Sequence, residues 1–223
     1  MPVRTYDAPV LRAVFFDFGG VITESPLDGF ARLEQERGLP PGFIASVNLR
    51  DYHSNAWARL ERSEVTPADF DQLFADESSA LGHEIRGADV LAVIHGEVRP
   101  EMVAALDVLR EEGYVLACLT NNVSAPADGG GFSRYAEVLA KFDNVVESSK
   151  VGARKPERHF YEAACERTGV QPSECVFLDD LGVNVKAARE MGMSTIKVTG
   201  AAQALGELAG LLGLQRLRQL VGG

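Results

Sequence analysis

The chain has 223 residues, of which 46% are hydrophobic and 24% are charged, and its formal net charge is −10. This length and composition fit one globular core with a small inserted module. The acidic balance without a basic run argues against nucleic acid or an anionic membrane as a partner, and no apolar stretch suggests a membrane span. An anionic substrate would therefore have to be held by local positive groups.

Three cysteines, Cys118, Cys165 and Cys175, are too few and too scattered for a disulfide scaffold or a zinc knuckle. Cys118 and Cys175 lie in apolar, strand-like runs, which predicts buried and inert thiols. The N-terminal segment lacks the apolar core of a secretion signal. Together these features predict a cytoplasmic protein.

The first predicted strand, residues 12–16, is apolar and ends at Asp17, which Phe18, Gly19 and Gly20 follow. The carboxyl ends of the strands carry the site in open α/β sheets, so a carboxylate at this position suits a nucleophile or a metal ligand. The glycines allow a tight turn and the close approach of a ligand. On its own, the segment is equally consistent with a strand that ends in an acidic loop.

Residues 24–96 show helical patterns and no convincing strand. One helix is predicted around residues 27–33 and a second from about Gly42 to Leu60. Thr66 and Pro67 have the character of an N-cap and a first-turn proline, so they predict the start of a third. An all-helical insertion after the first strand would lie above the carboxyl ends of the sheet, where a lid belongs.

Strands and helices alternate in the remainder of the chain. Further strands are predicted at 114–119, 145–147, 175–178 and 195–198, and helices at 100–112, 133–142, 156–169 and 183–191. Leucines at helical spacing predict that residues 201–220 are helical and pack on the sheet, although their glycines argue against one unbroken helix.

This alternation predicts an α/β fold, a doubly wound parallel sheet in three α/β/α layers, with the helical cap inserted after the first strand. The predicted core is residues 1–23 and 97–223, and the predicted cap is residues 24–96.

Three further segments lie at the ends of predicted elements, as Asp17 does. Thr120-Asn121-Asn122 offers a hydroxyl and free backbone N–H groups to a phosphate oxygen, although alone it is an ordinary turn. Lys155-Pro156 places a cation beside a predicted helix start, which would attract an anion. Asp179-Asp180 places two carboxylates after a buried strand, where both stay ionised more easily beside a cation.

Carboxylates favour Mg²⁺ over zinc, because Mg²⁺ binds through few protein carboxylates and keeps several water and substrate oxygens. Zinc prefers His and Cys. Asp17 together with Asp180 therefore matches a magnesium site.

In this order, the segments resemble the haloacid dehalogenase-like hydrolase superfamily. The four motifs are Phe15-Phe16-Asp17-Phe18-Gly19-Gly20-Val21, Leu119-Thr120-Asn121-Asn122, Lys155-Pro156, and Phe177-Leu178-Asp179-Asp180 with Asn184-Val185 following. Segments 57–62 and 148–156 resemble the subfamily that contains the N-terminal phosphatase-like domain of soluble epoxide hydrolase. Each motif is weak alone, whereas the ordered set is specific and covers nearly the whole chain.

The resemblance implies a Mg²⁺-dependent phosphohydrolase that acts on a small phosphorylated metabolite. Asp17 would be the nucleophile and form an aspartyl-phosphate. Thr120 and the Asn121 backbone would hold the phosphoryl group, and Lys155 would neutralise charge. Mg²⁺ would be held by Asp17, by the Gly19 backbone carbonyl and by Asp180, with Asp179 nearby.

Gly19 departs from the family pattern, since phosphatases of the family usually carry a general acid–base aspartate two residues after the nucleophile. A glycine keeps the backbone carbonyl for the metal and removes the proton donor. The resemblance therefore leaves open a catalytically weak protein that binds a phosphorylated ligand or a partner. A dehalogenase is a further alternative, although dehalogenases of this family generally carry a bulky aromatic residue at this position and do not use Mg²⁺.

Overall fold

The computed structural model describes residues 10–122 and 134–222, whose strands form one five-stranded parallel sheet in the order β3-β2-β1-β4-β5. The strands are β1 (Ala13–Phe16), β2 (Val115–Thr120), β3 (Asn144–Glu147), β4 (Cys175–Asp179) and β5 (Ser194–Lys197). Central β1 pairs in parallel with both β2 and β4, so that Phe16 lies opposite Cys118 and Leu178. The predicted doubly wound sheet is confirmed, and its strand order reverses between β1 and β4.

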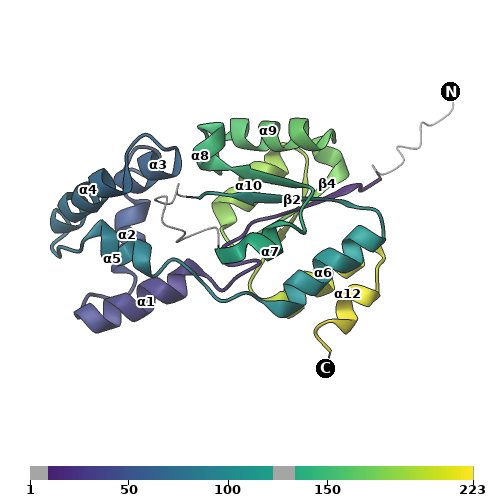
Figure 1. The fold of residues 1–223 in the computed structure, drawn as a ribbon, viewed down its shortest axis with the longest axis horizontal. Helices are drawn as coiled ribbons and strands as arrows, with labels where there is room; N and C mark the ends of the chain where they lie inside the picture. The colour runs from purple at the N-terminus through teal and green to yellow at the C-terminus, as the bar shows by residue number, and fades with distance from the viewer. Residues whose placement is uncertain (1–9, 123–133, 223) are drawn as a thin grey trace.

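Helices cover both faces of the sheet (Figure 1). On one face, α6 (Pro100–Glu111), α11 (Ala201–Leu212) and α12 (Arg216–Gln219) pack with Val14 and Phe16 of β1. On the other, α9 (Arg158–Thr168) and α10 (Gly182–Glu190) pack with Ala13 and Phe15. Successive side chains of β1 enter opposite layers, as the pleat of a strand requires, and this confirms the three-layer architecture.

Five helices lie between β1 and α6 in sequence: α1 (Pro26–Arg37), α2 (Phe43–Leu49), α3 (Ala56–Glu61), α4 (Pro67–Ser79) and α5 (Gly87–Ala92). They enclose a hydrophobic cluster of their own, with Phe70, Phe74 and Ile44 fully buried. Figure 1 shows them beside the core, on the side toward which the strands run. Thr66 caps α4 in a capping box with Asp69, as its sequence predicts.

Two of the predicted helices are divided or shortened in the structure. The helix predicted from Gly42 to Leu60 is two helices, because the chain turns after α2 and the Asn55 side chain caps a new helix by accepting a hydrogen bond from the Ala58 N–H. The helix predicted at 133–142 reduces, in its described part, to a short 3-10 turn and α7 (Ala136–Leu139). Residue 133 lies outside the described part.

The C-terminal segment is helical and packs on the sheet, and α11 ends at Gly213, whose φ of 71° is left-handed. The predicted break in this segment is therefore confirmed. The remaining helix of the core, α8 (Ser148–Val151), follows β3 directly. No helix in the described ranges is both long enough and apolar enough to cross a membrane.

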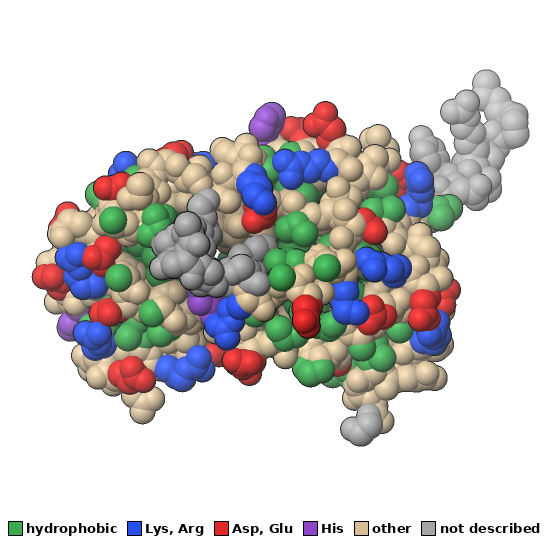
Figure 2. All heavy atoms as spheres, in the orientation of Figure 1, with side chains coloured by type: hydrophobic (Ala, Val, Ile, Leu, Met, Phe, Trp, Pro, Cys, Tyr) green, Lys and Arg blue, Asp and Glu red, His purple; other side chains and the backbone are tan. Residues whose placement is uncertain are grey.

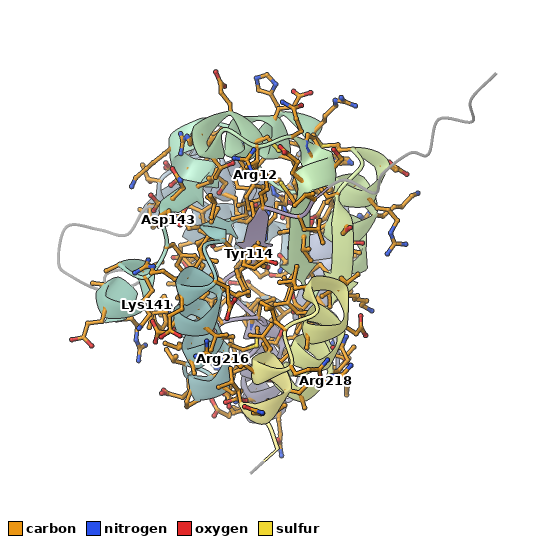
Figure 3. The ribbon with its side chains drawn as sticks, turned by 90° about the vertical axis from the view of Figure 1, so that its right-hand side faces the viewer. Arg12, Tyr114, Lys141, Asp143, Arg216 and Arg218 are labelled. Atoms are coloured by element: carbon orange, nitrogen blue, oxygen red, sulfur yellow. The ribbon has the colours of Figure 1, made fainter. Side chains whose placement is uncertain are left out.

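The amino ends of the strands form the edge of the sheet that faces the viewer in Figure 3, where Arg12, Tyr114 and Asp143 each directly precede a strand. Exposed ion pairs lie at this edge, and one of them joins Arg12 and Glu174 at 3.2 Å. Figure 2 shows acidic and basic side chains interspersed across one broad face of the molecule, without a continuous area of one sign.

Candidate active site

The carboxyl edge of the sheet brings together three aspartates from two neighbouring strands. Asp17 follows β1 directly, Asp179 is the last residue of β4, and Asp180 comes next. One oxygen from each carboxylate lies within 4.8 Å of the others. Because β1 and β4 flank the reversal of strand order, the cluster lies where open α/β sheets form their binding crevice.

Lys155 inserts a buried ammonium group into this cluster. Its Nζ lies 2.7 Å from Asp17 Oδ1 and 2.8 Å from Asp179 Oδ2, and its side chain is 1% exposed. The Asn121 side chain holds the lysine backbone from both sides: Lys155 N–H donates to Asn121 Oδ1 at 2.8 Å, and Asn121 Nδ2 donates to the Lys155 carbonyl at 3.0 Å. The end of β2 thus fixes the cation against the end of β1.

The segment that carries Lys155 is a turn, so the prediction that Pro156 starts a helix is wrong. The Glu157 N–H donates to the Arg154 carbonyl at 2.7 Å, and the Glu157 side chain accepts from the Arg154 N–H at 3.2 Å. Glu157 is extended and lies at the N-cap position of α9, which begins at Arg158. Because the turn is closed by its own hydrogen bonds, the lysine projects from a rigid loop.

Asn184, which follows the fourth motif and has no predicted role, lies beside Asp179. Its Nδ2 donates to both carboxylate oxygens of Asp179, at 3.1 and 3.0 Å. Its carbonyl accepts from the Tyr161 hydroxyl at 3.0 Å, which ties α10 to α9. An amide in the first turn of the helix that follows a strand-terminal aspartate is a sequence signal that would have identified this residue.

Asp180 is held less tightly than Asp179. Ser25, the N-cap residue of α1, donates its hydroxyl to Asp180 Oδ2 at 3.2 Å. Gly20 has a left-handed φ of 80°, and a Cβ atom on it would lie 2.2 Å from the same oxygen. Only a glycine allows this close approach, so Gly20 is the glycine of the loop that the geometry requires.

Burial and mutual repulsion disfavour the ionised carboxylates. The pKa of Asp17 is raised well above its usual value by burial, an effect that Lys155 opposes and that Asp179 and Asp180 reinforce. Burial together with Asp179 raises the pKa of Asp180 to about 6. Burial disfavours the Lys155 ammonium, but the two carboxylates in contact with it outweigh this effect and raise its pKa.

The donor set fits Mg²⁺ by its chemistry. Among the described residues, Lys155 is the one cation that pairs with this cluster, through Asp17 and Asp179, so full ionisation of the three aspartates sets three negative charges against one positive and leaves a net charge of −2. All the side-chain donors are oxygens, which hard cations such as Mg²⁺ prefer. A divalent ion would therefore balance the charge that the fold gathers here.

Thr120 and Asn121 lie at the carboxyl end of β2, next to β1. Thr120 is buried, and its hydroxyl is a hydrogen-bond donor at the edge of the sheet that carries the aspartates. The Asn121 side chain is occupied by Lys155, so its backbone is the part that remains for a ligand.

Gly19 does not have a left-handed φ, but a Cβ atom at this position would lie 3.3 and 3.4 Å from two atoms of the Pro26 ring. The ring occupies the space into which a side chain at position 19 would begin to extend. Position 19 therefore carries no proton donor, and the Pro26 ring leaves little room for a side chain that could act as one.

The amino-acid sequence matches known proteins over most of its length. Residues 11–192 match the family model described as haloacid dehalogenase-like hydrolase. The chain is 35% identical over 211 residues to acyl-CoA dehydrogenase family member 10 of Mus musculus, a match that covers 91% of this chain and 19% of that protein. It is 29% identical over 221 residues to bifunctional epoxide hydrolase 2 of Sus scrofa, covering 93% of this chain and 40% of that protein. The chain thus spans less than half the length of these two relatives.

A relative of similar length is sesquiterpene phosphatase astK of Aspergillus oryzae (strain ATCC 42149 / RIB 40), which is 28% identical over 212 residues, or 91% of this chain and 97% of that protein.

Two solved structures share the fold. A HAD-family enzyme of Bacteroides thetaiotaomicron in complex with magnesium and inorganic phosphate superposes with a TM-score of 0.55 at 22% identity, over 83% of this chain and 93% of that chain. A dehalogenase with an intermediate complex superposes with a TM-score of 0.67 at 19% identity, over 92% of this chain and 98% of that chain. At these identities the likeness shows the fold alone.

Proposed function

The chain belongs to the haloacid dehalogenase-like hydrolases, and on that premise we propose that it is a Mg²⁺-dependent phosphohydrolase that cleaves a small phosphorylated molecule through an aspartyl-phosphate on Asp17. The observation that carries the proposal is the buried cluster in which Lys155 bridges Asp17 and Asp179 beside Asp180. Phosphoryl transfer needs positioning and electrostatic stabilisation above all, and this cluster offers both.

Asp17 is the proposed nucleophile. Its Oδ1 accepts hydrogen bonds from the Phe18 N–H at 2.6 Å and from Lys155 Nζ at 2.7 Å, which hold the carboxylate in one orientation. A carboxylate oxygen attacks phosphorus, the bond from phosphorus to the leaving oxygen breaks, and that oxygen takes up a proton. Water then attacks the phosphorus of the aspartyl-phosphate, which releases inorganic phosphate and restores Asp17.

Thr120 and Lys155 are proposed to bind the phosphoryl group. Thr120 is the last residue of β2, the strand beside β1, and its hydroxyl is a hydrogen-bond donor. Together with the Asn121 backbone it can donate to phosphoryl oxygens, while the Lys155 ammonium offsets their charge. Such donors are most effective in a site that excludes water.

Asp17, the Gly19 carbonyl and Asp180 would hold Mg²⁺, with Asp179 nearby. The bound ion would supply electrostatic stabilisation of the charge on the transferring phosphoryl group. Asp179 is committed to Lys155 and Asn184, so it is better suited to orient the cluster than to bind the ion. The magnesium and phosphate held by the related Bacteroides enzyme support this assignment.

The helices of residues 24–96 are proposed to form a cap that covers the site and selects the substrate. Ser25 before α1 donates to Asp180, and Glu61 at the end of α3 accepts from Asn121, so two separate parts of the insertion reach the cluster. A phosphatase among relatives of the same length supports a phosphate ester as the substrate.

Gly19 favours a second candidate function, the binding of a phosphorylated ligand without efficient turnover. General acid–base help contributes ~10²–10⁴ in rate, and Pro26 crowds the position from which it usually comes. The site would then retain affinity for phosphate and Mg²⁺ while it turned over only esters with good leaving groups.

A panel of phosphorylated metabolites, assayed with Mg²⁺ and with excess chelator, separates these functions. We expect Mg²⁺-dependent phosphate release from at least one ester, and no release by Asp17→Asn, because an amide cannot attack phosphorus. Tight binding without release of phosphate from any ester would favour the binding function. Full activity in chelator would refute the metal assignment and reopen dehalogenation.

A further inference from the structure

Two ion pairs of opposite polarity join the inserted helices to the core next to Lys155. Glu61, the last residue of α3, pairs with Arg154, and the adjacent Arg62 pairs with Glu157 at 2.9 Å. Arg154 and Glu157 are the first and last residues of the turn that carries the lysine. The inserted helices thus contribute an acid, Glu61, to the first residue of this turn and a base, Arg62, to its last residue.

The Glu61–Arg154 pair is almost completely buried, with side chains 7% and 4% exposed. Arg154 also donates to the Tyr52 carbonyl at 2.9 Å, and its guanidinium lies 4.5 Å from the centre of the Tyr52 ring. Glu61 accepts from the Trp57 indole at 2.8 Å. Since Tyr52 and Trp57 belong to the insertion, loss of its seating would strip Arg154 of its contact partners, and an unpaired buried charge is strongly unfavourable.

Glu61 is also connected to the proposed nucleophile. Its Oε2 accepts from Asn121 Nδ2 at 3.3 Å, and the same amide group bonds the Lys155 backbone through both of its polar atoms. Lys155 in turn contacts Asp17. An unbroken chain of charged and hydrogen-bonded groups therefore runs from the end of α3 to the reacting carboxylate.

We propose that Glu61 is a positioning residue which, with Arg154, Arg62 and Glu157, forms a paired-charge latch that couples the seating of the inserted helices to the placement of Lys155 against Asp17. This inference rests on the proposed function for its catalytic consequence. The lysine reaches its working position only when the helices are seated, so charge neutralisation and the exclusion of water occur together.

Glu61→Gln tests the latch because it keeps the size of the side chain and removes its charge. We expect kcat for p-nitrophenyl phosphate to fall by about 10- to 100-fold, in the range of other outer supporting residues, with a smaller change in KM. Amide hydrogen exchange should accelerate together in α3 and in residues 154–157. Asp89→Asn, which breaks an exposed ion pair within the insertion, is the matched control and should change neither measurement.

The half-buried Arg62–Glu157 pair gives a second test, which stays informative if Glu61→Gln does not fold. Arg62→Glu and Glu157→Arg should each lower kcat and accelerate exchange in both segments. The double variant should recover part of the loss, because the pair is re-formed with its polarity reversed, while the bond from the Arg154 N–H to Glu157 stays lost. Unchanged kcat and exchange in Glu61→Gln, or a double variant worse than both single ones, would overturn the latch. If the wild-type protein hydrolyses no phosphate ester, the proposed function fails, while exchange in the same variants still decides whether the two segments are coupled.

Discussion

The two edges of the β-sheet carry similar charged residues in opposite environments. At the amino edge, two of the residues labelled in Figure 3 form surface pairs: Lys141 binds Asp107 with side chains 33% and 52% exposed, and Arg216 binds Glu111 with 52% and 62% exposed. At the carboxyl edge, Lys155 binds Asp17 and Asp179 with all three side chains at most 12% exposed.

This contrast separates exposed charges, which water solvates, from the buried charges of the proposed active site. An exposed pair contributes about 0–1 kcal/mol to stability, because water solvates its partners nearly as well. A buried pair offers little net stability, yet the loss of one partner is severely unfavourable. The fold therefore maintains the carboxyl-edge cluster at a cost, as is common for functional sites.

Replacing the lysine at each edge of the sheet in turn should give the largest difference in stability and in kcat. Lys155→Met should destabilise the protein by about 3–5 kcal/mol, because it leaves two buried carboxylates unpaired, and should lower kcat by about 10²–10³. Lys141→Met should change stability by less than about 1 kcal/mol and leave kcat unchanged. Urea unfolding and steady-state kinetics measure both, and equal effects for the two lysines would erase the distinction.

Gly19 lies at the carboxyl edge, where the charged groups are present but position 19 offers no side chain to donate a proton. The reaction rate should therefore depend on the leaving group. Aryl phosphates with acidic leaving groups should react faster than alkyl phosphates by ~10²–10⁴, the usual contribution of general acid–base catalysis. Slow hydrolysis of the Asp17 intermediate should produce an initial burst of the leaving group. A rate that does not depend on the acidity of the leaving group would mean that another residue donates the proton.

Gly19→Asp should flatten this dependence and shorten the lifetime of the intermediate. Because the new Cβ atom would lie 3.3 Å from the Pro26 ring, we expect the full gain only when Pro26→Ala is added. Pro26→Ala alone is the control for effects on α1. Rapid-quench and steady-state assays over a series of leaving groups measure the gain, and a folded double variant without any gain would show that position 19 does not limit the rate.

Asp180 lies at the weakly partnered side of the cluster. Asp180→Asn should raise the Mg²⁺ concentration needed for half-maximal activity by about 10- to 100-fold, since it removes one ligand charge. Ser25→Ala, which removes only the hydroxyl bonded to Asp180, should have a much smaller effect. An unchanged Mg²⁺ requirement in Asp180→Asn would remove this residue from the proposed ligand set.

The smallest expected effect is a pH dependence of thermal stability. Folding raises the pKa of Asp180 from 3.8 to about 6, so the folded metal-free protein binds this proton more tightly than the unfolded chain. The resulting stabilisation is complete below the unfolded value and disappears as pH rises through the folded value. Because Mg²⁺ competes with the proton, it should raise Tm more at pH about 8 than at about 5, and Asp180→Asn should lose most of this difference.

The strands and the central part of the site could be predicted because they depend on local sequence and one topological rule. Apolar runs defined β1 and β4, and the shared edge of parallel strands brought Asp17 and Asp179 together. The turn at Pro156 was not predicted, because a proline suits a turn as well as a first helical position. The contact of Glu61 with Arg154 joins distant segments that carry no common pattern, so only the tertiary structure could reveal it.

The two chain crossings between the core and the inserted helices lie side by side. Thr23 and Val98 form an antiparallel bridge, Glu24 N–H donates to the Glu97 carbonyl at 2.8 Å, and Arg99 N–H donates to the Ile22 carbonyl at 2.9 Å. A segment whose ends meet can be exchanged for another of different length without stretching the sheet, since the entropy of closing a loop grows slowly with its length. This seam is therefore a natural junction for chimeras in which the α/β core is joined to other helical modules.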